Sequence, residues 1–211
     1  MAEQEKGATG EKQGAGQKSL LKDILCTLAN PGKVAEEGGP GLKASSILLG
    51  VTVLVFGLIY QYMFPRLLDQ LPMLGGIRKV GKLLTFSKDA AFDFGLFLRF
   101  LIGAVLIIAC WYLLALIAGL VSRDKALRSP LAALRTAAAC AVPFTVATLL
   151  ALPLFFAHYA AGLLPIIVLL FSTYIHHQSQ VKYYKLTPAI AIYTSPLVWF
   201  IQIYCFTLVM P

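Results

Sequence analysis

TAAACAVPFTVATLLALPLFFAHYAAGLLPIIVLLFSTYIHHQSQV, residues 136–181, is a run of 46 residues without Asp, Glu, Lys or Arg. One bilayer crossing needs about 20 predominantly apolar residues in a helix. The run is therefore long enough for two crossings, and the short turn AHYAAG (157–162) lies between them. This stretch predicts a helical hairpin that crosses a membrane twice.

The rest of the chain has the same character. Of its 211 residues, 58% are hydrophobic and only 13% are charged, and the mean hydropathy is +0.76. A soluble domain carries about 25% charged residues. The composition predicts an all-α, polytopic transmembrane bundle of about five spanning helices, accompanied by two short interfacial amphipathic helices.

The expected organisation divides the chain into three parts. Residues 1–18 are polar and without apolar periodicity, which is typical of a disordered tail, here placed in the cytoplasm. Residues 19–43 are expected to form an amphipathic helix and a hinge, EEGGPGLK. The transmembrane domain takes residues 44–211. Its expected spans are 44–64 (closed by Pro65), 94–121, 131–156, 160–175 and 187–210.

The first amphipathic helix is expected along the membrane surface or against the bundle, because it is too short to span. Its apolar residues are Leu20, Leu21, Ile24, Leu25 and Leu28, with Lys22, Asp23 and Thr27 on the other face.

The second interfacial helix is expected over Gly76–Ser87, between the first two spans. Arg78, Lys79 and Lys82 share one face, opposite an apolar face. A helix of this kind lies in the headgroup layer, where long cationic side chains reach the lipid phosphates. Arg99 lies six positions into the second span, and we interpret it as a headgroup contact, the alternative being a functional intramembrane charge.

The distribution of Lys and Arg predicts the orientation. With five spans, the tail near the membrane, the connections 122–130 and 176–186, and Arg135 at the start of the third span share a side. That side carries eight Lys or Arg residues, against five on the opposite side. The positive-inside rule then places the N-terminus in the cytoplasm and the C-terminus outside. The same count places residues 65–93 on the non-cytoplasmic side.

Candidate sites are few. Ala133, Ala137 and Ala141 recur every four residues and predict close helix packing, within the bundle or between two copies of the chain. His176 and His177 are adjacent, so they diverge by about 100° on a helix, and we interpret them as a polar pair at the membrane edge and not as a metal site. The four cysteines are scattered singly, which gives no support for a zinc site or a disulfide.

Other classes of function are disfavoured by the residues. We find no Ser-His-Asp set, no HExxH and no phosphate-binding glycine loop, so we expect a non-enzymatic protein without metal or cofactor. The 18 Lys and Arg residues are spread over the tail and the short connections, which suits lipid headgroups and argues against a nucleic-acid partner.

The order of these elements resembles the Yip1-domain family of small five-span membrane proteins. The likeness covers residues 19–211 and depends on LANPGKVAEE (28–37), the basic SRDKALRSPLAALR (122–135) and the polar HHQSQVKYYK (176–185). The trafficking motifs of eukaryotic members are absent, which points to prokaryotic relatives and to the bacterial cytoplasmic (inner) membrane. The resemblance implies a role in membrane organisation or trafficking-like processes through helix packing, the lipid bilayer, a membrane-protein partner or a homo-oligomer. A small transporter or channel subunit is the alternative.

Overall fold

The computed structural model describes residues 8–70, 93–122 and 124–209, and this part of the chain contains helices and turns but no strand. In chain order its elements are α1 (Ala8–Ala29), α2 (Pro31–Glu36), α3 (Leu42–Gln70), α5 (Phe94–Val121), η2 (Lys125–Arg128), α6 (Pro130–Ala157), η3 (Tyr159–Leu163), α7 (Leu164–Lys182) and α8 (Pro188–Val209).

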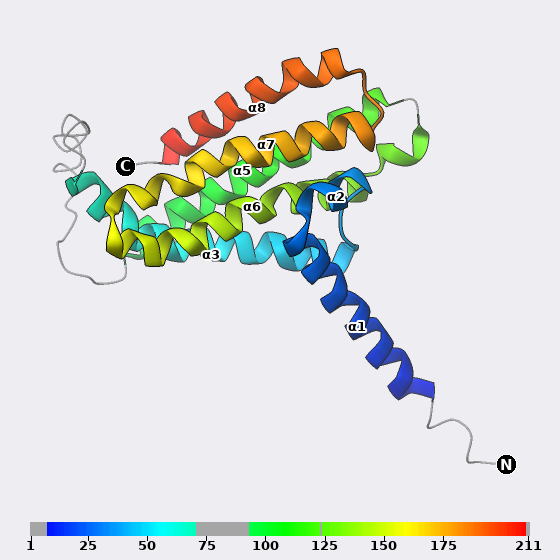
Figure 1. Cartoon of the computed structure of the whole chain (residues 1–211), viewed down its shortest axis with the longest axis horizontal. Helices are drawn as coiled ribbons and strands as arrows, with labels where there is room; N and C mark the ends of the chain where they lie inside the picture. The colour runs from blue at the N-terminus through cyan, green and yellow to red at the C-terminus, as the bar shows by residue number, and fades with distance from the viewer. Residues whose placement is uncertain (1–7, 71–92, 123, 210–211) are drawn as a thin grey trace.

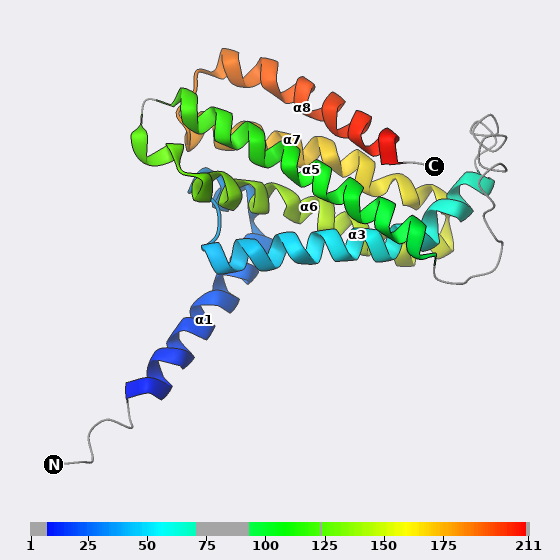
Figure 2. The same ribbon diagram turned by 180° about the vertical axis from the view of Figure 1, so that it is seen from behind.

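Among the described residues four helices, α3, α5, α6 and α7, are long and apolar enough to cross a membrane, judged by length and composition. They lie side by side in one bundle (Figure 1). The prediction of an all-helical fold with several membrane-competent helices is confirmed for the described residues. The fifth predicted span corresponds to α8, which packs against α5 and α7 on the far side of the bundle from α3 (Figure 2), and its crossing stays a prediction.

The core of the bundle is built around α6, which contacts α3, α5 and α7. Small side chains fill its central face, and Ala137, Cys140 and Ala141 are fully buried. In a membrane, helices associate mainly through close packing, because lipid tails are as apolar as the side chains themselves. The alanine-rich face of α6 therefore lets three neighbouring helices approach its backbone.

Aromatic side chains close the part of the core between α3 and α5. The rings of Phe56 and Tyr60 stack with centroids 4.3 Å apart, and Phe64 meets Phe100 edge to face at 5.2 Å. The Tyr60 hydroxyl donates a 2.6 Å hydrogen bond to the carbonyl of Gly162. This bond ties α3 to the turn that joins α6 to α7.

The outer surface of the bundle is apolar. Large hydrophobic side chains such as Leu54, Leu113, Leu150 and Leu170 are about half exposed or more. In water such a surface would mark a large binding patch, whereas lipid tails cover it at no cost. The outward leucines therefore agree with a bundle that lies in a bilayer.

Three helix boundaries differ from those expected. Residues 8–18, expected to be disordered, are helical and continue into α1, since Ala, Glu, Lys and Gln are strong helix formers. Helix α3 passes through Pro65 to Gln70, because packed membrane helices tolerate the lost hydrogen bond. Helix α7 continues to Lys182, seven residues past the expected end. The predicted interfacial helix at Gly76–Ser87 lies outside the described residues.

The apolar side chains of α1 face away from the bundle. Its leucines Leu21, Leu25 and Leu28 face outward, 60%, 56% and 42% exposed, whereas Thr27 is fully buried against the bundle. The Thr27 hydroxyl donates to the carbonyl of Asp23 over 2.6 Å, so the polar group is buried with a partner. Beyond this contact, α1 projects away from the bundle (Figure 1).

Candidate functional site

The segment after α1 folds back onto the bundle. Asn30 ends α1 and caps α2: its side chain accepts a 3.1 Å hydrogen bond from the backbone N–H of Lys33, and Pro31 occupies the first helical position. Both features are typical of a helix start. The chain therefore turns sharply at Asn30, and the short helix α2 lies against α6 and α7.

The predicted hinge is held in place by α6. Gly38 and Gly39 have positive φ angles of 94° and 84°, which favour glycine. A Cβ atom at Gly39 would overlap the backbone carbonyl of Arg135, so the two backbones are in direct contact. The Arg135 guanidinium donates from Nε to the Pro40 carbonyl (2.7 Å) and from Nη2 to the Gly39 carbonyl (3.0 Å). These contacts hold the turn at Gly38–Pro40 in one conformation against α6.

An ion pair links α2 to the end of α7. Lys182 Nζ lies 2.7 Å from Glu36 Oε1, and the two side chains are 54% and 30% exposed. An exposed pair of this kind contributes about 0–1 kcal/mol to stability. Its main effect is to set the position of α2 along α7, and it opens at small cost.

A groove of about 590 Å³ lies between these two elements. One wall is formed by residues 29–33 and Glu36, and the other by a single face of α7. Along that face the side chains change from apolar to charged in the order Phe171, Tyr174, Ile175, Gln178 and Lys182.

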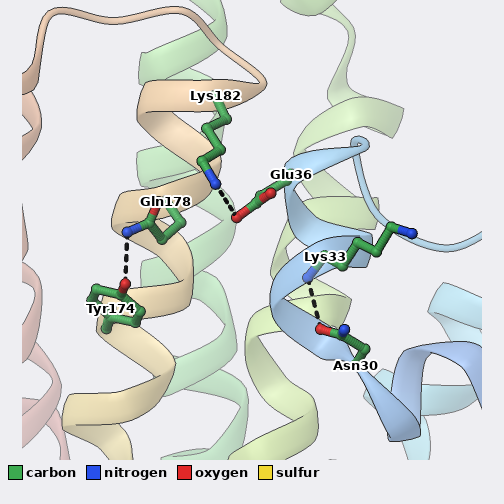
Figure 3. A network of polar contacts seen from close by, with 6 residues as sticks. All are labelled: Asn30, Lys33, Glu36, Tyr174, Gln178 and Lys182. Atoms are coloured by element: carbon green, nitrogen blue, oxygen red, sulfur yellow. Dashed lines mark hydrogen bonds and ion pairs between the residues drawn. The ribbon is translucent and has the colours of Figure 1, made fainter.

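Figure 3 shows how the polar side chains of the groove lie. The Tyr174 hydroxyl accepts a 2.8 Å hydrogen bond from Gln178 Nε2, and Lys182 reaches across to Glu36. The ammonium of Lys33 points away from α7 (Figure 3). The charges at the polar end of the groove are therefore one carboxylate and one ammonium, side by side.

A second group of polar side chains lies on the buried face of α7. Ser172, His176 and Ser179 are at most 1% exposed, and Ser172 Oγ, His176 Nε2 and Ser179 Oγ have no hydrogen-bond partner among the described residues. His176 is hydrogen-bonded to the backbone of Trp111 on α5. His176 is thus buried inside the bundle, because α7 continues and turns this residue inward, and its place at the membrane edge stays a prediction.

One polar contact lies at the end of the bundle, beyond α7. Tyr184 is fully buried, and its hydroxyl lies 3.2 Å from Thr136 Oγ1 in a hydrogen bond. Burial raises the pKa of Tyr184 to about 12, and the bond with Thr136 offsets part of this rise. The phenol is therefore neutral and acts as a packed, hydrogen-bonded anchor.

The other residues singled out from the sequence are dispersed. Ala133, Ala137 and Ala141 are buried inside the bundle, and Arg99 is exposed near the start of α5. Arg78, Lys79 and Lys82 lie outside the described residues. Within the described ranges no group of three His, Cys, Asp or Glu side chains could hold a metal ion.

The groove was not predicted from the sequence. Its two walls are linked by Glu36 and Lys182, which are 146 positions apart in the chain. The one sequence feature that indicates the groove is the order of Phe171, Gln178 and Lys182 on one helical face. Comparisons with protein-family models, with curated proteins and with solved structures found no match to this chain.

Proposed function

We propose that this chain is a non-enzymatic integral membrane protein of Yip1-like type, which acts on membrane organisation through lipid and protein contacts. The observation that carries the proposal is the groove between α2 and α7, whose wall changes from apolar to charged along the bundle. Such a gradient follows the change from acyl chain to headgroup in one leaflet of a bilayer.

Helix α1 supports the same function. Its leucines Leu21, Leu25 and Leu28 form an exposed apolar row, and the bilayer is the partner that covers such a row at least cost. We place this end of the bundle in the cytoplasm, as the positive-inside rule predicts. A helix inserted beside the bundle in one leaflet would expand that leaflet and favour curvature.

The test is the shape of vesicles that contain the full chain. We expect reconstituted vesicles to be smaller or more tubular in electron micrographs than vesicles without protein. Replacing Leu21, Leu25 and Leu28 together by Ala should reduce the effect, because it removes apolar bulk and keeps a good helix former. Lys22→Ala, a change at an exposed position on the same helix, is the control. Vesicles indistinguishable from empty ones would overturn the proposal.

A small transporter or channel subunit is the second candidate. It is favoured by buried polar atoms without a hydrogen-bond partner in the described part of the chain, namely both amide atoms of Gln61 and of Gln202. Gln202 is fully buried on α8. Flux of a small solute into the same vesicles, abolished by Gln202→Leu, would favour this candidate over the first.

A further inference from the structure

The polar end of the groove presents two opposite charges, Glu36 and Lys182, next to an apolar trough. We propose that the groove binds one phospholipid with a phosphoethanolamine headgroup, with the lipid phosphate at Lys182 and the primary ammonium at Glu36. This inference rests on the proposed function and names its lipid partner.

The length of the groove fits one lipid. Phe171 and Lys182 are eleven positions apart, which is about 16 Å along a helix. The headgroup layer of each leaflet is about 5–8 Å thick. With Lys182 at the level of the phosphates, Phe171 therefore lies at the depth of the acyl chains. Phe171 is 55% exposed and offers its ring to a chain.

The polar middle of the groove suits the glycerol and ester region. Gln178 and Tyr174 form a hydrogen-bonded pair on α7, and the Asn30 amide lies on the opposite wall. Amide and phenol groups can donate to ester oxygens. The groove thus offers each part of a phospholipid a partner of matching polarity.

The ion pair between Glu36 and Lys182 is exposed, so it opens at small cost. A phosphoethanolamine group then gives each side chain a new partner of opposite charge. Its primary ammonium carries three N–H donors for the carboxylate, whereas a choline trimethylammonium carries none. A phosphoglycerol headgroup has no cation, and it would leave Glu36 facing a phosphate. The chemistry therefore selects phosphoethanolamine over both.

The experiment measures lipid retention by the intact chain. The delipidated full-length protein is mixed with phosphatidylethanolamine, phosphatidylcholine or phosphatidylglycerol of identical acyl chains, and bound lipid is counted by native mass spectrometry. We expect phosphatidylethanolamine to bind about tenfold more tightly than either of the others, a difference equal to one good polar contact. Free phosphoethanolamine at millimolar concentration should not displace it, because the soluble compound lacks the acyl contacts.

Two kinds of variant locate the site. In Gly32→Phe the new side chain fills the groove: a Cβ atom there would meet only Asn30 Oδ1 at 3.9 Å, and loss of binding is expected. Gly50→Phe is the matched control, since nothing lies within 4 Å of a Cβ at this exposed position on α3. Glu36→Gln should abolish the preference over phosphatidylcholine, whereas Lys182→Gln should weaken all three lipids.

Equal binding of the three lipids, or full binding by Gly32→Phe, would overturn the inference. Displacement by free phosphoethanolamine would show a site for a soluble compound, which also overturns it. These outcomes can be distinguished from failure of the proposed function. If the three lipids bind equally but the protein still changes the shape of vesicles, the proposed function is retained and only the lipid preference is wrong.

Discussion

Arg135 Nε donates to the carbonyl oxygen of Pro40 over 2.7 Å, although 95 positions separate the two residues in the chain. A guanidinium is charged at any physiological pH, and its hydrogen bonds to carbonyls are stronger than neutral ones. Through this contact, the segment that carries α1 and α2 is attached to the most buried helix of the bundle.

Arg135→Gln should loosen the N-terminal segment without unfolding the bundle. A hydrogen bond to a charged group contributes about 1.5–3 kcal/mol, and two such bonds are lost. We expect faster trypsin cleavage after the exposed Lys33, measured in detergent by gel electrophoresis. The control is Arg128→Gln, whose bond to the Ser122 carbonyl is long at 3.4 Å. Equal cleavage rates in the two variants would contradict the role given to Arg135.

Gly39→Ala should destabilise the protein more than its small size suggests. The positive φ of 84° strains an L-residue by about 1–3 kcal/mol, and the new Cβ overlaps the Arg135 carbonyl. We expect a lower midpoint in thermal unfolding monitored by circular dichroism. Gly50→Ala is the matched control, and it should be neutral or stabilising by up to about 1 kcal/mol, because it lies in a helix with open space around it.

Stability should fall between pH 10 and pH 12 because of Tyr184. An unfolded tyrosine ionises near pH 10, whereas burial raises the pKa of Tyr184 to about 12 in the folded protein. Below pH 10 both states are neutral and the stabilising contribution is complete. Above pH 10 ionisation stabilises the unfolded state, and the free energy of unfolding falls by up to about 2.7 kcal/mol over two pH units.

Tyr184→Phe should lessen this decline, at the cost of leaving Thr136 without its partner at neutral pH. Melting temperatures from pH 8 to pH 12 measure the effect, and Tyr62→Phe, at an exposed position, should keep the decline. A Tyr184→Phe profile that falls as steeply as the unaltered protein's would count against this assignment.

Cysteine labelling tests which end of the bundle is cytoplasmic. In a background without the native cysteines, Phe156→Cys and Lys185→Cys place exposed thiols at opposite ends of α6 and α7. If the positive-inside rule holds, a membrane-impermeant thiol reagent labels position 156 in intact cells, and position 185 only after permeabilisation. The reverse pattern would invert the proposed orientation.

The spans could be predicted because each is a long apolar run, and the range 94–121 coincides with α5. The end of α7 could not be predicted, because the polar residues His176, Ser179 and Gln180 are typical of a connection between helices. In the structure they are helical and buried by neighbouring helices. For α1 the sequence left open whether the leucines face the membrane surface or the bundle. In a bilayer the surrounding lipid accepts leucine equally well, so hydrophobicity does not tell inward from outward.

The long-range contacts were beyond sequence reasoning altogether. The partners of Arg135 and Lys182 lie 95 and 146 positions away, and nothing in either residue's neighbourhood identifies them. The glycines of EEGGPGLK suggested a hinge. Glycines with positive φ angles occur in mobile and in fixed turns alike, so the sequence alone does not distinguish the two.

The polar face of α7 has a consequence for how the chain enters the membrane during synthesis. Helix α7 carries the polar residues Ser172, His176 and Gln180. Each polar group raises the free energy of transfer into lipid, so α7 alone should insert poorly into the membrane. Helix α6 precedes it directly and packs along it. We therefore expect α7 to insert efficiently only as a hairpin with α6. In a glycosylation-mapping assay, residues 161–187 alone should stay largely in the lumen, and residues 129–187 should insert as a pair.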